Sequence, residues 1–258
     1  MLKRRTFLTV ASMTGLMPAA FAKNADTQWN KTVDVLVFGG GMAGLTAAIS
    51  AKQNGAKNVL LLEKAAYLGG HSVMSGAGYY IGGTDKQKNA GIDDSLEINW
   101  KDAVGRGVAA NRFIKRDTTV ARTVYENGVE TMRWLESLGV KFTDQPVQGI
   151  GNRKRVHYVA PGYKRGSPEL IKALNQAALK AGVVIQTNSK LVSLITESKE
   201  LGAPVIGAVV EEKGKTFNIR ATGGVILATG GFANGPEMVK RYHPYLEGVP
   251  SLGSKMNV

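Results

Sequence analysis

The sequence predicts an α/β fold built on a parallel β-sheet, and three features predict it. A β-type run over residues 33–38 precedes a glycine-rich turn and an alanine-rich stretch. A second apolar run follows at residues 59–62, and a third, over residues 224–232, ends in another glycine-rich turn. Strand, helix and strand in this order form a right-handed β-α-β unit whose strands are parallel.

The first turn has the spacing G-x-G-x-x-G over residues 39–44. Such a turn uses Gly39 to reverse direction tightly, Gly41 to let the backbone approach a pyrophosphate, and Gly44 to let the helix pack on the strand. The helix, expected over residues 43–54, then directs its N-terminal N–H groups at the phosphates. The turn therefore predicts a binding site for the diphosphate of a dinucleotide.

An acidic residue stands where such a site needs one. Glu63 directly follows the second strand, 24 positions after Gly39. In this arrangement the carboxylate accepts hydrogen bonds from the hydroxyls of the adenosine ribose. Strand, glycines, helix, strand and acid in this order predict a Rossmann-type domain.

Two further stretches favour FAD over NAD. Small and hydroxyl-bearing residues at 69–72 and 75–78 follow Glu63, and they can bring backbone N–H groups to a long, extended cofactor. The distant strand at 224–232 ends in Ala-Thr-Gly-Gly and turns the backbone back towards the cofactor. An NAD-linked dehydrogenase, the alternative, would pass directly from the acid into another helix and strand. The predicted fold is thus a glutathione reductase-like FAD-binding domain.

The rest of the chain predicts a helical insertion, at about residues 80–166, and a β-hairpin or meander. Strands are expected at 183–187 and 191–196, followed by a hairpin of 205–211 with 216–220. Within the insertion, residues 118–138 have helical spacing, and an apolar stripe is expected to pack in the core. The stripe consists of Val120, Val124, Met132, Leu135 and Leu138.

The N-terminus predicts export. Residues 1–22 combine a basic start, an apolar stretch and a small-x-small cleavage signal at Ala20-Phe21-Ala22. The pair Arg4-Arg5 followed by Thr-Phe-Leu favours the twin-arginine route over a general secretory signal. A linker over 23–31 follows, and no later stretch predicts a transmembrane segment. The mature chain is expected in the periplasm.

Composition excludes several kinds of chemistry. The chain has no cysteine, so disulfides, thiol catalysis, cysteine-bound metal and covalently attached c-type haem are excluded. Its three histidines lack ligand spacing, and no metal site is predicted. The net charge of +13 suits a small anionic substrate or an acidic partner, but no nucleic-acid motif accompanies it. The basic run 153–155 beside His157 either faces an anionic ligand or forms a solvated loop.

Four segments together resemble the fumarate reductase/succinate dehydrogenase flavoprotein family. They are residues 33–44, Glu63-Lys64, residues 69–72 and residues 226–232. The resemblance extends from about Lys31 to Val258, and the nearest relatives look like soluble periplasmic flavocytochrome c-type fumarate and urocanate reductases. The residues 155–157 also resemble a stretch that precedes a long helix in this family.

The resemblance implies FAD contacts at the positions of Ala43, Glu63, His71, Ser72, Ala77 and Gly78. His71 stands where those relatives often carry asparagine, and either side chain can donate a hydrogen bond. The cofactor-binding residues that we expect are Gly39, Gly41, Met42, Ala43, Gly44, Glu63, Lys64, Gly70, His71, Ser72, Ala77, Gly78, Val192, Ala228, Thr229 and Gly230.

The resemblance also implies a reaction and a division into domains. Relatives transfer hydride from flavin N5 to a carbon–carbon double bond beside a carboxylate, as in fumarate or urocanate. We expect the FAD-binding domain over residues 32–245 and, over 246–258, the start of a segment leading to a capping domain. In the family that later domain carries the proton donor, so no catalytic residue is assigned here.

The implied partners are a separate cytochrome c or quinol-linked electron donor and a chain that supplies the capping domain. The alternative interpretation is a truncated or split, non-catalytic fragment that binds FAD and lacks the substrate domain.

Overall fold

The computed structural model describes residues 27–110, 118–149, 153–251 and 253. The chain forms two compact units, one of residues 1–70 with 178–258 and one of residues 71–177. The predicted leader, at residues 1–22, lies outside the described residues, as do residues 256–258.

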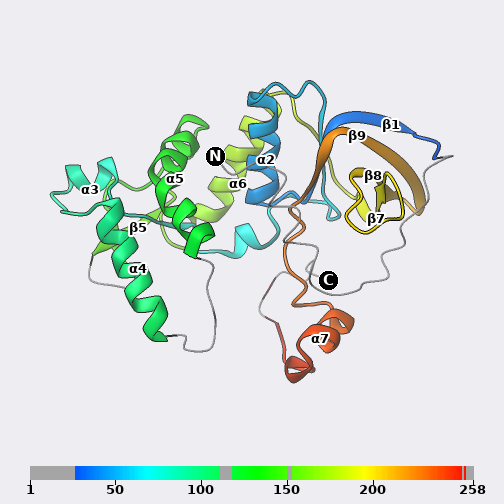
Figure 1. The fold of residues 1–258 in the computed structure, drawn as a ribbon. Coiled ribbons are helices and arrows are strands. Elements are labelled where there is room, and N and C mark those ends of the chain that lie inside the picture. Colours follow the sequence, from blue (N-terminus) through cyan, green and yellow to red (C-terminus); the bar gives the residue numbers. More distant parts are fainter. Residues whose placement is uncertain (1–26, 111–117, 150–152, 252, 254–258) are drawn as a thin grey trace. The chain divides into compact units, whose positions relative to one another are not determined.

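The first unit contains a six-stranded sheet with the order β6-β2-β1-β9-β8-β7. Figure 1 labels β1, β9, β8 and β7 of this sheet. The first four of these strands are parallel, whereas β8 pairs antiparallel with both β9 and β7. The strands are β1 (Lys31–Phe38), β2 (Val59–Leu62), β6 (Val184–Gln186), β7 (Lys190–Thr196), β8 (Val205–Glu212) and β9 (Lys215–Leu227). The predicted α/β fold with its parallel sheet is confirmed.

Burial explains why these segments form the centre of the sheet. All four residues of β2 are buried, as expected of a parallel strand covered on both faces. Helix α2 (Met42–Gln53) packs on β1 and β2 through Leu45, Ala48 and Ile49, which lie on one helical face. The hydrophobic core of the sheet includes Val33, Leu36, Phe38, Leu60, Leu62, Ala208, Val210, Ile219 and Ala221.

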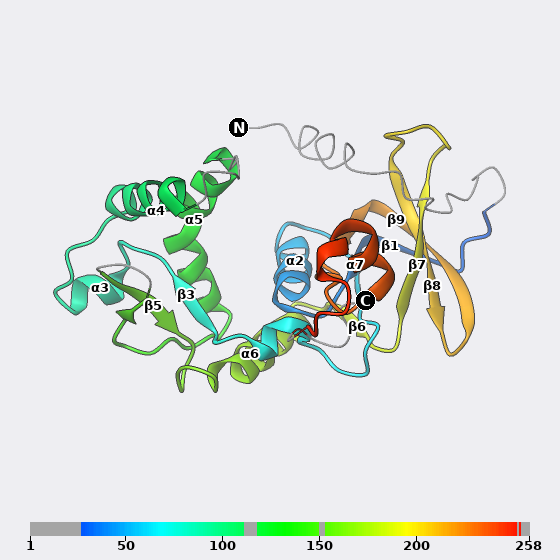
Figure 2. The ribbon, with the colours of Figure 1, turned by 90° about the horizontal axis from the view of Figure 1, so that it is seen from below.

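The two strands predicted at 216–220 and 224–232 are one continuous strand, which corrects the prediction. The structure joins them in the 13-residue strand β9, which reaches Leu227. Its first half pairs with β8, and from Ile219 onwards it pairs with β1. A bulge between the two halves keeps the strand continuous, because the register against β1 shifts by one residue between Ala221 and Gly224. Figure 2 shows β9 continuing beside β7 and β8.

The described ends of the first unit are short elements. Residues 27–30, within the predicted linker, lie along β9, where the Asn30 N–H donates to the Asn218 carbonyl oxygen (2.9 Å). The Asn218 N–H donates in return to Oδ1 of Asn30 (2.8 Å). After β9 come the helix α7 (Pro236–Tyr242) and the 3-10 turn η3 (Pro244–Leu246).

The second unit contains helices and a small antiparallel sheet that sequence analysis did not predict. The sheet has the order β3-β5-β4, and helices α4 and α5 pack on each other (Figure 2). The elements are η2 (Gly70–Met74), β3 (Gly78–Tyr80), α3 (Asp85–Asn89), α4 (Leu96–Ala110), α5 (Thr118–Ser137), β4 (Val147–Gln148), β5 (Lys154–Tyr158) and α6 (Gly166–Lys180). Both η2 and α6 cross a unit boundary.

The predicted apolar stripe of α5 is buried over only part of its length. Met132 and Leu135 are buried, but Val120 is 48% exposed and Val124 is 64% exposed, which corrects the prediction. In the N-terminal half of α5 a different face contacts α4. There the ring of Tyr125 meets the ring of Trp100 edge-on, with 5.5 Å between the ring centroids. The stripe is therefore turned away from the contact between α4 and α5.

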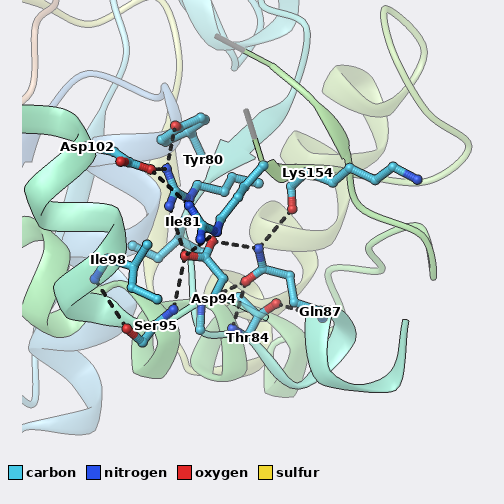
Figure 3. Close-up of polar contacts among 12 residues, drawn as sticks. Tyr80, Ile81, Thr84, Gln87, Asp94, Ser95, Ile98, Asp102 and Lys154 are labelled. Atoms are coloured by element: carbon cyan, nitrogen blue, oxygen red, sulfur yellow. Dashed lines mark hydrogen bonds and ion pairs between the residues drawn. The ribbon is translucent and has the colours of Figure 1, made fainter. Parts of the chain in front are cut away.

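A buried ion pair holds the second unit together (Figure 3). Arg155 donates to both carboxylate oxygens of Asp94 (2.6 and 2.8 Å), and to Asp102 (2.8 Å). The Arg155 and Asp94 side chains are no more than 1% exposed. Burial acts to raise the pKa of Asp94, but hydrogen bonds from Arg155 and Gln87 outweigh it and hold that pKa below its ordinary value. Both partners therefore remain charged at neutral pH.

The basic run 153–155 is only partly solvated. Arg155 and the nearby His157 are fully buried in β5, whereas Lys154 is exposed and the Arg153 side chain is 35% exposed. Arg155 does not face an anionic ligand, because its guanidinium contacts two carboxylates of the chain. Burial lowers the pKa of His157, whose Nε2 lies 3.3 Å from the Ile81 carbonyl oxygen. The prediction of a solvated loop is thus wrong for Arg155 and His157, which lie inside a sheet.

Replacing Arg155 with methionine is expected to lower the free energy of unfolding by about 3–5 kcal/mol, because it leaves the buried Asp94 carboxylate unpaired. Urea denaturation measures this loss. The matched control is Arg133→Met, whose half-exposed ion pair with Asp85 is worth about 0–1 kcal/mol. Equal midpoints for the two variants would show that the buried pair contributes no more than the exposed one.

Candidate functional site

The glycine turn after β1 is a point of close backbone approach. Gly39 has a φ of +109°, and a β-carbon there would lie 2.2 Å from the Ala228 carbonyl oxygen. A β-carbon on Gly44 would lie 1.8 Å from the carbonyl oxygen of Gly39. Only glycine fits at either position, because real non-bonded contacts of a β-carbon are much longer. The end of β1, the start of α2 and the end of β9 are thereby held together.

Helix α2 begins directly behind this turn. Gly41 is its N-cap, no side chain caps the end, and no acidic residue stands in the first turn. The first N–H groups of an α-helix have no carbonyl partner inside the helix, and they point out of its N-terminal end. Together with the helix dipole they favour an anionic group at this end. The absence of a β-carbon at Gly41 leaves the backbone open to a pyrophosphate.

Glu63 lies at the end of β2, next to the turn. Its side chain is 8% exposed, and its Oε2 accepts a hydrogen bond from the Gly40 N–H (2.7 Å). Its Oε1 accepts from the Ala65 N–H (2.8 Å). These two bonds fix the carboxylate, and each oxygen retains a lone pair that can accept a further bond from a ribose hydroxyl.

A cavity of about 340 Å³ opens at the carboxyl ends of β1, β2 and β9. Cavities of this size hold small ligands, and ligands of parallel α/β sheets bind at this edge. The lining residues are Phe38, Gly39, Leu62, Glu63, Lys64, Ser189, Lys190, Leu191, Thr229, Gly230, Gly231, Phe232 and Met238. The open backbone at the glycine turn, the ribose acid and the cavity fit the adenosine diphosphate portion of FAD.

Five of the twelve cofactor residues expected in the first unit line this cavity. They are Gly39, Glu63, Lys64, Thr229 and Gly230. Apart from Val192, the remaining members are Gly41, Met42, Ala43 and Gly44 at the start of α2, Gly70 in η2, and Ala228, whose N–H donates to the Phe38 carbonyl oxygen (2.8 Å). Their contacts with FAD stay predictions.

Val192 does not line the cavity, although its neighbours Ser189, Lys190 and Leu191 do. It is 51% exposed and is the extra residue of a bulge in the edge strand β7, because Leu191 pairs with Val210 and Ser193 with Val209. A bulge leaves its extra residue out of the ladder, so the backbone of Val192 remains open to a ligand.

The other four expected residues belong to the second unit and form a compact turn there. His71 and Ser72 lie in η2, and Gly78 begins β3. Ala77 is buried and has a φ of +49°, a conformation that costs a non-glycine residue about 1–2 kcal/mol. Its carbonyl oxygen accepts from the Val159 N–H (3.0 Å), which ties the turn to the end of β5.

Sequence reasoning missed several residues of the cavity wall. Phe232 and Met238 follow the Ala-Thr-Gly-Gly turn. The prediction that this turn faces the cofactor was the available signal that residues just after it could line the site. Ser189 is 1% exposed and has no local pattern that would reveal it.

In the part of the chain that the structure describes, no group of three histidine, aspartate or glutamate side chains is placed to hold a metal ion. No described helix is long and apolar enough to cross a membrane.

Comparison with known proteins agrees with this geometry. A family model described as "FAD binding domain" matches residues 34–257. A probable fumarate reductase of Shewanella frigidimarina is 34% identical over 86% of this chain and 36% of its own length. An acrylate reductase flavoprotein subunit of Shewanella woodyi is 33% identical over 95% of this chain and 49% of its own length.

A solved structure of the open conformation of a flavocytochrome c3 fumarate reductase superposes with a TM-score of 0.78 and 32% identity. The match covers 88% of this chain and 39% of that one. The chain thus spans between about a third and a half of the length of these relatives.

Replacing Gly44 with alanine is expected to abolish retention of FAD, because the new methyl group would push α2 away from the Gly39 carbonyl oxygen. Overpacking of this kind also costs about 1–3 kcal/mol of stability. The measurements are flavin absorbance after gel filtration and thermal unfolding. The control is Ser50→Ala on the exposed face of the same helix. A G44A chain that kept its flavin and its melting temperature would contradict the close approach.

Replacing Glu63 with alanine is expected to weaken FAD binding by at least about tenfold, since hydrogen bonds to a charged acceptor are worth about 1.5–3 kcal/mol. Titration of flavin-free protein with FAD measures the change in Kd. The control is Glu200→Ala, an exposed carboxylate between β7 and β8. The same Kd in both variants would remove Glu63 from the site.

Proposed function

The chain belongs to the FAD binding domain family, and from that premise we propose that it is the flavin-binding part of a reductase of α,β-unsaturated carboxylates. The observation that carries the cofactor assignment is the cavity at the ends of β1, β2 and β9, with Glu63 fixed beside the glycine turn. The names of the relatives support the substrate class.

The proposed acceptor class follows from what those relatives share. One is named for fumarate and one for acrylate. Both compounds have a carbon–carbon double bond conjugated to a carboxylate, but they differ in the group at the far end. Once reduced by its electron donor, bound FAD would supply the hydride for reduction of such a bond, and a protein acid would supply the proton. In the first unit, the residues of this chain would bind the diphosphate at the N-terminus of α2 and hold the ribose at Glu63.

The proposed electron source is a separate cytochrome c or quinol-linked donor in the periplasm. The leader-like residues 1–22 support export, with the twin-arginine route as our proposal. The absence of cysteine from the 258 residues means that they cannot bind c-type haem covalently. A relative named as a flavoprotein subunit is consistent with redox centres on different chains. We also propose that a capping domain completes the substrate site.

The test is anaerobic stopped-flow oxidation of the reduced flavin. The purified chain, reconstituted with FAD and with a capping domain added as a separate chain, is reduced with dithionite and mixed with fumarate, acrylate or urocanate. Reoxidation by at least one of these acceptors is expected, and succinate, the saturated analogue of fumarate, is the control.

A chain that held FAD but was reoxidised by none of the three acceptors would contradict the reductase proposal. That result would favour the other interpretation, a fragment that binds FAD without catalysing a reaction. A chain that bound no FAD would contradict both interpretations.

A further inference from the structure

The turn between β6 and β7, residues 186–190, forms part of the cavity wall and is tied to the segment that carries Glu63. Ser189 and Lys190 line the cavity. The Ser189 N–H donates to the Glu63 carbonyl oxygen (2.9 Å), and the Glu63 N–H donates to the Gln186 carbonyl oxygen (2.9 Å). The Asn188 N–H donates to the carbonyl oxygen of Ala65 (3.0 Å). Any movement of this turn would therefore displace Glu63 through these backbone hydrogen bonds.

One carboxylate holds both ends of this turn. Glu212 lies at the end of β8, on the strand that pairs with β7. Its Oε1 accepts a hydrogen bond from Oγ of Ser189 (2.9 Å) and another from Nε2 of Gln186. Ser189 is buried, and its hydroxyl has two acceptors within reach, the Glu212 carboxylate and the Thr187 carbonyl oxygen (3.1 Å). The bond to the charged carboxylate is the stronger of the two.

The turn needs such support because it is irregular on both sides. Asn188, at its tip, has a φ of +56°, in the left-handed region. The bulge at Val192 interrupts β7 two residues after the strand begins. Between these irregular positions Lys190 pairs with Glu211, directly beside Glu212. The hydrogen bond between Glu212 and Ser189 thus joins the paired strands β7 and β8 to the cavity wall through side chains.

We propose that Glu212 is a positioning residue for the adenylate half of the cofactor, a proposal that rests on the FAD-binding function proposed above. Glu212 does not line the cavity. It acts through Ser189, whose backbone is bonded to Glu63, and so fixes the distance between the ribose acid and the bulged strand. The effect is expected at the adenylate end of the cofactor, because the turn is bonded to the segment that carries Glu63.

The experiment is calorimetric titration of the flavin-free 258-residue chain with ADP and, separately, with FAD. Glu212→Ala is expected to weaken both ligands by the same factor, about tenfold, the value of one hydrogen bond to a charged group. Glu212→Gln retains a side-chain oxygen that accepts from Ser189, so its loss is expected to be about threefold or less. Glu211→Ala, the matched control on the same strand, removes an equal charge and is expected to bind as the wild type does.

A coupling measurement separates positioning from general stabilisation. If Glu212 acts through Ser189, then the double variant S189A/E212A loses no more affinity than E212A alone, because E212A has already broken the contact with Ser189. Additive losses would overturn the proposal. If E212A does not fold, S189A and E212Q still test it, since S189A must weaken ADP binding by a larger factor than E212Q does.

Unchanged ADP binding by E212A, or an equal loss in E211A, would overturn the positioning role alone and leave FAD binding by the chain intact. A wild-type chain that bound neither ADP nor FAD would overturn the proposed function as well. The two failures are therefore distinguishable in one set of titrations.

Discussion

The first unit depends on three backbone segments that meet without side chains between them. The carbonyl group of Gly39 sits against Gly44 of α2, and Gly39 itself sits against the carbonyl group of Ala228 at the end of β9. This contact fixes where β1 ends, where α2 begins and where β9 stops. The cavity exists at this edge because the parallel strands all end there. A larger residue at either glycine would separate the elements that form the walls.

Polar groups set the finer geometry, and they do so through single carboxylates that each have two partners. Glu63 bonds the turn through one oxygen and its own loop through the other. Glu212 holds Ser189 and Gln186 through one oxygen. Such groups resist displacement, since moving any member breaks bonds to the others as well. In the second unit the buried pair of Arg155 and Asp94 has the same character, because removal of one charge leaves the other without compensation.

The sequence predicted what depends on local pattern. Gly39, Gly44 and Glu63 follow a fixed spacing because the β-α-β unit sets the distance between them, and this part of the fold is confirmed. Continuity of β9 depends on a bulge and on two different partner strands, which no local pattern records. Val120 was misplaced because a helical stripe specifies a face but not its neighbour. Ser189 and Glu212 meet across 23 residues, and neither has a distinguishing neighbourhood in the sequence.

The described part of the chain indicates its cofactor more clearly than the acceptor that the cofactor would reduce. Relatives named for fumarate and for acrylate align with nearly the same portion of this chain, at 34% and 33% identity. Those two acids differ by a carboxylate, and discrimination between them needs charged or polar groups at the far end of the acceptor. The shared portion instead provides an anion site without a side chain and one acid for ribose hydroxyls, and both match the constant part of FAD. Acceptor choice must therefore depend on residues in which the relatives differ, placed around the flavin ring rather than around the adenylate.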